Sequence, residues 1–459
     1  MIKILKDKFN VAISFWFKQT TDIKTDGPYG IMRKGLLIPL LFYRIMNRIK
    51  SRFYTTFKLI TTNAILIIKN FQYLPMFLYT INNKIDIFLV RREHIGHYPI
   101  NFYLSKMKYG TKDIYIYDND RKFNINSYLD TKIEKLFNFD QRFENVYKIM
   151  KSVSILSFGK YYYNEFPEQM GFNTEFSQLF SKRNKLFDFN DRENQNGNEF
   201  LKKYNIEPGN FVCLHIRSNE YYLDRGLNKI DDRIFYNQNP NIYINSLKYL
   251  LESNYSVIRM GKGVKNMFPF SHPNFVDYAF SDDRNDFLDI WLSANCKFIF
   301  GSTSGFTQFP MIFGVPYLDT NNFPYGRMQS WGPQYVTLPS IARRHGKSLL
   351  TLKDIVELDL IGRADQRFFD KLSVEIIESS PQDILNAVKD IENKIQKGFI
   401  VNDINMKFWT NMKNEWHSGM NLPWSEPDKY FDYFHKMDGI SVTIPDFYLE
   451  KYSHLFLDY

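Results

Sequence analysis

The stretch FVCLHIR (211–217) is apolar through its middle and ends in polar residues, which is the pattern of a strand buried inside a parallel sheet. Strand and helix patterns alternate after it: a helix over 241–253, the strand YSVIRMG (255–261), the strand NFVDYAFS (274–281), a helix over 286–296, the strand KFIFGSTSG (297–305), a helix over 306–314 and the strand VPYLDTN (315–321). Strands separated by helices of about 10–13 residues pair in parallel through right-handed crossovers. The sequence therefore predicts a doubly wound α/β domain, in which ligands bind at the carboxyl ends of the strands.

Two further strands, IDIFLVRR (85–92) and KDIYIYDND (112–120), predict a second α/β region before this domain, and VSILSFG (153–159) is a candidate third strand. The polar, Asn-rich stretch DFNDRENQNGNEF (188–200) indicates a loop and a helix start at a domain boundary. After residue 366 the pattern is mostly helical. We therefore expect four parts: an N-terminal segment over 1–75, α/β domains over 76–205 and 206–365, and a helical tail over 366–459 that packs back on the body.

The composition excludes several classes of protein. The 459 residues include only 22 Gly and 18 Pro, which excludes collagen-like and low-complexity chains. The two cysteines, Cys213 and Cys296, lie in apolar runs. They exclude a disulfide framework and a cysteine-rich zinc site, and they favour a reducing compartment.

The net charge of +9 is concentrated at the N-terminus. Residues 1–70 carry 13 Lys/Arg and 3 Asp/Glu, whereas residues 71–459 carry 46 Lys/Arg and 47 Asp/Glu. A neutral body lacks the basic stripe of a nucleic-acid-binding protein, so we expect no nucleic-acid partner. The candidate partner of residues 1–70 is an anionic membrane surface.

Residues 38–58 predict a basic amphipathic helix of the kind that lies in a membrane interface, and an ordinary surface helix packed on the body is the alternative. Its apolar stripe and its basic stripe consist of Leu41, Ile45, Ile49 and Phe53 and of Arg44, Arg48 and Arg52. No run of about 18 uncharged apolar residues predicts a membrane-spanning helix, and no small-residue cleavage site indicates a signal peptide. We expect a cytoplasmic protein that binds peripherally to the inner face of the cell membrane.

The tripeptide His215-Ile216-Arg217 ends the first strand of the 206–365 domain. An arginine that leaves a buried strand at its carboxyl end can pair with a phosphate through its guanidinium fork. The alternative is a salt bridge to a nearby carboxylate such as Glu220 or Asp224.

The loop GSTSGF (301–306) lies between a strand and a helix and has the composition of an anion cradle, because free backbone N–H groups and the helix dipole point at its ligand. It is not a P-loop, since no Lys follows its second Gly. The dinucleotide fingerprint GxGxxG is absent, and GKGVKN (261–266) fails at its last position. A helix start capped by Ser304 or Thr303 is the alternative interpretation.

The ordered motifs HIR, IRMG, DYAFS, KFIFGSTSGF and FGVP resemble those of a family of bacterial glycosyltransferases with the GT-B architecture, most specifically over residues 211–321. More distantly, HIR is similar to the His-x-Arg of GDP-fucose-dependent fucosyltransferases. The resemblance implies two Rossmann-like domains that face a cleft, with the acceptor side in 76–205 and the nucleotide-sugar side in 206–365. It also implies a nucleotide-sugar donor, a glycan or lipid-linked acceptor, no bound cofactor and no required metal.

The resemblance assigns Arg217, beside His215, to the donor diphosphate. The other implied donor residues are Ser302, Thr303, Ser304 and Gly305 around the phosphates, Arg259 and Gly261 beside the nucleotide, and Asp277 or Tyr278 at the base or ribose. Fucosyltransferases usually carry a second arginine directly after the first, but Ser218 stands there in this chain. The resemblance therefore implies neither fucose nor guanine.

The segment REHIGHYPIN (92–101) joins the first strand and the first helix of the 76–205 domain. Its glycine lets the backbone turn, and His97, His94 and Glu93 are candidates for the base that takes the acceptor proton, with His97 first. The alternative is that one histidine caps the helix while the other is solvated.

Asp118-Asn119-Asp120 could hold a divalent cation against a diphosphate, but an Asp-rich sequence after a strand is also an ordinary turn, which we expect here. The sequence thus favours a glycosyltransferase of bacterial surface polysaccharide synthesis. A nucleotide-dependent oxidoreductase or epimerase and a non-catalytic polysaccharide-assembly protein are the rivals.

Overall fold

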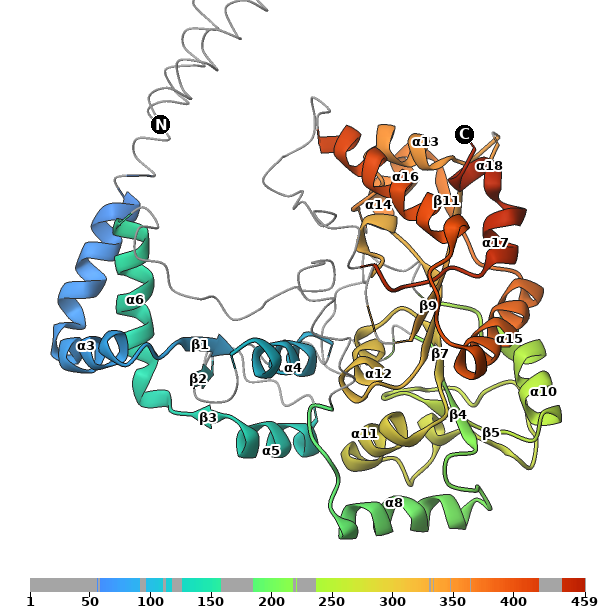
Figure 1. Cartoon of the computed structure of the whole chain (residues 1–459), viewed down its shortest axis with the longest axis horizontal. Helices are drawn as coiled ribbons and strands as arrows, with labels where there is room; N and C mark the ends of the chain where they lie inside the picture. The colour runs from blue at the N-terminus through green and yellow to red at the C-terminus, as the bar shows by residue number, and fades with distance from the viewer. Residues whose placement is uncertain are drawn as a thin grey trace, which may run out of the picture. The chain divides into compact units, whose positions relative to one another are not determined.

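The structure is a computed structural model, and it divides into two compact units, Met1–Tyr79 with Asn145–Tyr163 and Thr80–Glu144 with Asn164–Tyr459. Figure 1 shows the elements of both. The structure describes residues 56, 58–90, 96–109, 113–117, 126–157, 185–217, 220, 237–329, 332, 334–346, 348–363, 365–420 and 440–458.

A six-stranded parallel sheet in the order β6-β5-β4-β7-β8-β9 forms the centre of the larger unit. Its strands are β4 (Phe211–His215), β5 (Ser256–Met260), β6 (Phe275–Val276), β7 (Ile299–Ser302), β8 (Tyr317–Asn322) and β9 (Tyr335–Pro339). The strands run outward from β4 to one side and from β7 to the other, so the sheet is doubly wound, as predicted. Its topological switch point lies between β4 and β7, where sheets of this kind bind ligands.

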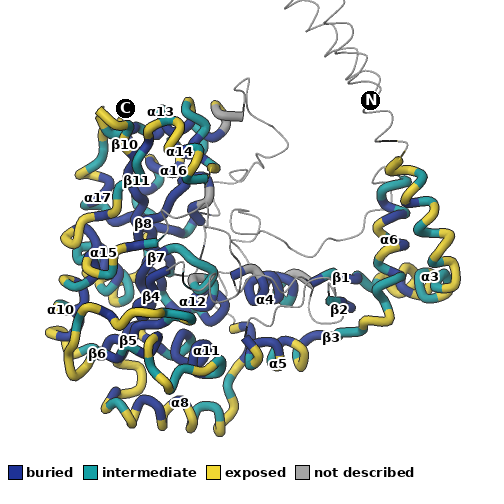
Figure 2. Tube along the Cα trace, turned by 180° about the vertical axis from the view of Figure 1, so that it is seen from behind, coloured by how far each residue is buried: buried dark blue, intermediate teal, exposed yellow. Residues whose placement is uncertain are grey.

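Helices cover both faces of this sheet (Figure 1). One face carries α10 (Ile244–Glu252) and α15 (Pro381–Lys397), and the other carries α11 (Asp286–Asn295) and α12 (Gln308–Phe313). Short 3-10 helices lead into or interrupt these elements: η6 (Pro240–Tyr243), η7 (Tyr278–Phe280), η8 (Gly305–Thr307) and η9 (Tyr325–Arg327). Figure 2 shows the strands as a buried layer between these helices, which is why each strand reads as a continuous apolar run in the sequence.

A second parallel sheet in the order β1-β2-β3 precedes the large one. Its strands and its helices are β1 (Ile87–Val90), α4 (His97–Tyr109), β2 (Ile114–Tyr117), α5 (Ser127–Leu136) and β3 (Asn138–Phe139). Residues 80–144 belong to the same compact unit as residues 164–459, because α4 packs against α12 and α5 against α11. The two predicted strands are present, and these helix contacts join their sheet to the large one.

The candidate strand over 153–159 is wrong, because its residues up to Leu156 belong to the helix α6 (Glu144–Leu156). The buried residues of α6 include Val146, Ile149 and Ser152, which recur every three positions, as on one face of a helix. A short apolar run does not distinguish a strand from a helix by itself. The predicted helix start in the Asn-rich stretch is confirmed, since Asn190 and Glu193 form a capping box at the start of α8 (Asp191–Lys203).

The C-terminal region is not purely helical, because β10 (Ile341–Arg344) and β11 (Val374–Ile377) pair antiparallel. Its helices are α13 (Leu352–Glu357), α14 (Gln366–Leu372), α16 (Asp403–Met420), α17 (Asp446–Lys451) and α18 (Ser453–Phe456). Thr337 N donates to Thr443 O at 2.9 Å, and the Trp409 indole donates to Val442 O at 3.0 Å. The first bond attaches the chain end to strand β9, and the second attaches it to helix α16.

In the smaller unit, a helix over Lys58–Lys69 is followed by η1 (Phe71–Tyr73), and the next helix α3 (Leu74–Asn82) continues into the larger unit. Except for residues 56 and 58, the amphipathic helix expected over 38–58 lies outside the described residues. Among the described helices, no single one is long and apolar enough to cross a membrane. The consecutive pair Lys58–Lys69 and Phe71–Asn82, bent by 64°, meets that requirement together by length and composition.

Candidate donor site at the switch point

Strands β4 and β7 lie side by side at the switch point, with His215 opposite Gly301. A Cβ at Gly301 would lie 1.8 Å from the carbonyl oxygen of His215, and the φ of Gly301 is +139°. Only glycine therefore lets the two strands approach at this point. This approach brings the end of the HIR motif to the start of the GSTSG loop, two segments that are about 85 residues apart in the sequence.

Arg217 leaves β4 directly into this junction, and the whole residue is 8% exposed. Its backbone N–H donates to Ser302 Oγ at 2.6 Å, which fixes the arginine to the first hydroxyl of the loop. Glu220, the carboxylate considered as its salt-bridge partner, accepts from the backbone N–H of Lys265 at 2.9 Å. Asp224, the other carboxylate considered, lies outside the described residues.

The hydroxyls of the loop bind the protein itself. Thr303 Oγ1 donates to Asp319 Oδ1 at 2.7 Å, and Ser304 Oγ lies 2.7 Å from His215 Nε2. Ser304 Oγ also accepts from Phe306 N at 3.1 Å, so Ser304 is the N-cap of η8, as the alternative interpretation predicted. These hydroxyls were expected to contact a phosphate, but in the structure they bond to other groups of the protein. They hold the shape of the loop, and the groups that suit an anion are backbone N–H groups at the start of η8.

His215 stacks on Phe306, with ring centroids 4.5 Å apart and an interplanar angle of 22°. Burial, with the positive charges of Arg259 and Arg217, lowers the pKa of His215 to about 4. The imidazole is therefore neutral at pH 7. It positions Ser304 and adds no charge of its own.

Asp319 is the buried group that the sequence did not single out. Located on β8, it is 1% exposed, and burial raises its pKa to about 6. Besides Thr303, its carboxyl accepts from Tyr335 Oη at 2.8 Å, from Tyr317 Oη at 3.3 Å and from the amide of Asn322. Asp319 thus joins strands β8 and β9 to the loop that follows β7. A lone acid inside the apolar run VPYLDTN was the available signal.

Arg259 and Asp277 pair with each other at 3.2 Å. The guanidinium of Arg259 also lies 5.2 Å from the centroid of the Phe268 ring, and Asp277 Oδ2 accepts from Phe268 N at 2.7 Å. These contacts hold the turn that follows β5, so most of the charge of Arg259 is compensated within the protein. Gly261 follows the same strand, and its carbonyl accepts from Arg284 Nε at 3.1 Å.

Tyr278 lies in the core, fully buried, and not at the edge of the sheet. Its hydroxyl donates to Asp289 Oδ1 at 3.0 Å, and burial raises its pKa. The predicted strand over 274–281 is shortened here to β6, because the chain turns into η7 directly after Asp277. We therefore retain Asp277 and omit Tyr278 as a candidate contact of the base or ribose.

The turn before α4 touches the loop directly. A Cβ at Gly96 would lie 2.6 Å from the Cα of Gly305, so these two glycines bring the backbones together. His97 begins α4 one residue later. Its side chain, together with Glu93 and His94, lies outside the described residues. The structure therefore places Gly96, the residue before His97, beside the candidate phosphate loop, although the two are more than 200 residues apart.

In the described part of the chain, no three His, Cys, Asp or Glu side chains form a group that could hold a metal ion. Asp118-Asn119-Asp120 lies outside that part. The two cysteines are both buried and free.

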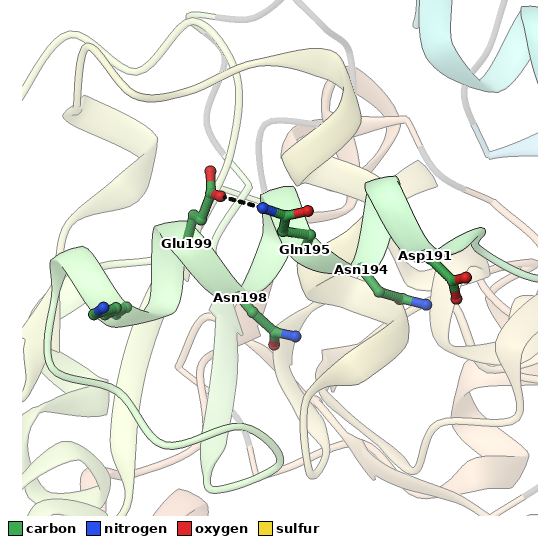
Figure 3. Close-up of a pocket in the computed structure, with 6 residues that line it drawn as sticks. Asp191, Asn194, Gln195, Asn198 and Glu199 are labelled. Carbon is green, nitrogen blue, oxygen red and sulfur yellow. Dashed lines mark hydrogen bonds between the residues drawn. The ribbon is translucent and has the colours of Figure 1, made fainter.

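A separate hollow of about 520 Å³ lies on α8 (Figure 3). It is lined by Asp191, Asn194, Gln195, Asn198, Glu199 and Lys202. All six residues come from one helix, and Figure 3 shows Gln195 bonded to Glu199 along it. Because no second element contributes a converging group, we do not place the functional site there.

No protein-family model matches the chain, and no curated protein matches it. Its fold is similar to that of a glycosyl transferase of family 9 from Veillonella parvula, with a TM-score of 0.38 and 9% identity over 68% of this chain and 97% of the other. It is also similar to TibC, a dodecameric iron-containing glycosyltransferase from enterotoxigenic E. coli, with a TM-score of 0.33 and 11% identity over 68% and 76%. At TM-scores below 0.5, neither likeness bears on the activity of this chain.

Proposed function

We propose that the protein is a glycosyltransferase that moves a sugar from a nucleotide-activated donor to a glycan or lipid-linked acceptor in bacterial surface polysaccharide synthesis. One observation carries the proposal: Arg217 and the GSTSG loop meet at the switch point of a doubly wound sheet, joined by the bond from Arg217 N to Ser302 Oγ. A cation and a helix start at this position suit the phosphates of a nucleotide.

In the proposed reaction, the acceptor oxygen bonds to the anomeric carbon of the sugar while the bond from that carbon to the phosphate oxygen breaks. The electron pair of the broken bond leaves on the nucleotide phosphate, and the acceptor proton goes to a base. The guanidinium of Arg217 and the start of η8 stabilise the charge that develops on the leaving group. No metal or bound cofactor is required for this role.

We propose His97 as the base, with His94 and Glu93 as the next candidates. The contact between Gly96 and Gly305 supports His97, because it holds the backbone next to His97 against the loop. His215 is excluded as a base at the donor, since its Nε2 is engaged with Ser304 and its pKa is about 4.

The rival oxidoreductase or epimerase is disfavoured by the first turn of the large sheet. In a sheet of this strand order, a dinucleotide-binding protein carries its glycine fingerprint directly after the first strand. Here β4 is followed by Ile216-Arg217-Ser218-Asn219-Glu220, which contains no glycine. A non-catalytic binding protein would retain the donor site but would not turn the donor over.

The test is sugar transfer and donor hydrolysis by the Arg217→Lys variant. Lysine keeps the charge but not the planar fork, so we expect a normal fold and a loss of turnover of about 100-fold or more. Arg343→Lys is the matched control, because Arg343 is half exposed and pairs with Glu375 away from the loop. Near-wild-type turnover in Arg217→Lys would remove this residue from the donor site.

A further inference from the structure

Exposed apolar side chains are concentrated on two consecutive helices. In the described part of the chain, eleven large hydrophobic side chains are exposed, and eight of them lie between residues 59 and 81. Figure 2 shows much of these helices as exposed. The eight residues are Leu59, Ile60, Ile65, Ile68, Phe71, Leu78, Tyr79 and Ile81. We call this region the 58–82 surface. Scattered exposed hydrophobics need no explanation, but a gathering of this kind does.

The polarity of the 58–82 surface is the reverse of that of a helix packed on a protein core. Asn63 is 6% exposed and Thr80 fully buried, whereas Ile68 is 72% and Phe71 66% exposed. The amide of Asn63 is satisfied by its own helix, donating to Leu59 O at 2.8 Å. An ordinary surface helix turns its apolar stripe inward and its polar face outward. The exposed apolar side chains of the 58–82 surface would therefore be stabilised by contact with an apolar medium.

The charge of the surrounding chain identifies that medium. Residues 27–85 contain nine Lys and Arg and no Asp or Glu. Three of these cations are exposed: Lys58 begins the 58–82 surface, Lys69 ends its first helix, and Lys84 follows it. Cations at the border of an apolar face suit an anionic lipid bilayer, since the hydrocarbon takes the side chains and the headgroups take the charges.

We propose that the 58–82 surface docks on an anionic lipid bilayer, with both helices lying in the interface. The bend of 64° and the short length of each helix fit this position. The 58–82 surface is a different membrane-binding region from the helix expected over 38–58. The proposal does not depend on sugar transfer.

The test is co-sedimentation of the full chain with vesicles of phosphatidylcholine, alone or with phosphatidylglycerol. We expect wild type to bind the mixed vesicles. The variant Ile68→Asp/Phe71→Asp should bind them at least about tenfold more weakly. Ile400→Asp is the matched control, because Ile400 is also 72% exposed but lies on the larger unit. The variant Lys58→Gln/Lys69→Gln leaves the apolar faces intact. It should bind the mixed vesicles more weakly than wild type does.

Equal binding of wild type and Ile68→Asp/Phe71→Asp would overturn the proposal, as would a wild type that binds neither vesicle. Binding that survives Ile68→Asp/Phe71→Asp but disappears on removal of residues 1–55 would assign it to the 38–58 helix. A wild-type dimer in ultracentrifugation that Ile68→Asp dissociates, without vesicle binding, would assign the surface to a second copy. Donor binding measured in the same variants keeps these outcomes distinct from a failure of the glycosyltransferase proposal.

Discussion

His215 and Arg217 leave the same strand two residues apart, and the structure gives them different surroundings. His215 is locked between Ser304 and Phe306 and is neutral at pH 7. Arg217 is attached to Ser302 through its backbone N–H, and its guanidinium carries a positive charge. At this scale, a short motif thus combines one residue that shapes the loop with one that carries the charge.

Asp319 gives a residue-scale prediction about pH. Its pKa is raised in the folded chain to about 6, above its ordinary value, so the folded state binds the proton more tightly than the unfolded state. The free energy of unfolding of wild type, relative to that of Asp319→Asn, should therefore fall as the pH rises from about 4 to about 6 and stay constant above. The expected change is on the order of 2–3 kcal/mol.

Urea unfolding of both proteins across this pH range measures that change. Asp289, another buried carboxyl whose pKa is raised to about 6, is present in both proteins and cancels in the comparison. Parallel pH profiles for wild type and Asp319→Asn would show that Asp319 does not titrate in this range.

The sequence could predict Arg217 and the loop because both follow buried strands, whose carboxyl ends share an edge. It could not predict that Ser302, Thr303 and Ser304 are engaged by the protein, since their partners lie on other strands. It also suggested Tyr278 as a ligand contact. The family resemblance gave that suggestion, but only the packing shows the side chain in the core.

At the scale of elements, the alternation of strands and helices was enough to predict the large sheet, because parallel pairing requires a crossover of this length. The strand β3, with two residues, and the helix α6 could not be predicted in the same way. A two-residue strand has no periodicity, and the apolar run at the end of α6 resembles a strand. The meeting of Gly96 with Gly305 is a tertiary contact that no local pattern encodes.

The close pairing of β4 and β7 gives a prediction at this scale. Gly301→Ala places a Cβ 1.8 Å from the carbonyl of His215, so we expect a loss of about 3 kcal/mol or more in the free energy of unfolding. Gly362→Ala is the control, because a Cβ there meets nothing within 4 Å, and its change should stay within about 0.5 kcal/mol. Thermal or urea unfolding of both variants measures the difference. Equal stabilities of the two variants would mean that β4 and β7 do not approach this closely at Gly301.

At the scale of the whole molecule, the uneven charge indicated early that the N-terminal segment differs from the body. The contacts between the two sheets are harder to predict. Residues 80–144 join the larger unit through α4 and α5, because helices on facing surfaces share one core. Where a chain divides depends on contacts between elements far apart in the sequence, and composition along the chain does not record them.

The whole enzyme should work without a divalent cation. The proposed charge stabilisation comes from Arg217 and the start of η8, so turnover should be unchanged in excess EDTA. Activity before and after chelation measures this directly. Loss of turnover, with recovery on addition of Mn²⁺ or Mg²⁺, would revive a metal role for Asp118-Asn119-Asp120.

The most direct measurement is the thermal stability of the full chain with UDP-, GDP-, ADP- and CMP-sugars and with NAD(P), in wild type and in Arg217→Lys. A ligand that binds the folded chain raises its melting temperature. We predict that at least one nucleotide sugar stabilises wild type, that Arg217→Lys loses most of this effect, and that NAD(P) has none. Stabilisation by NAD(P) alone, or an equal response of Arg217→Lys to the nucleotide sugar, would contradict a nucleotide-sugar site at the junction of β4 and β7.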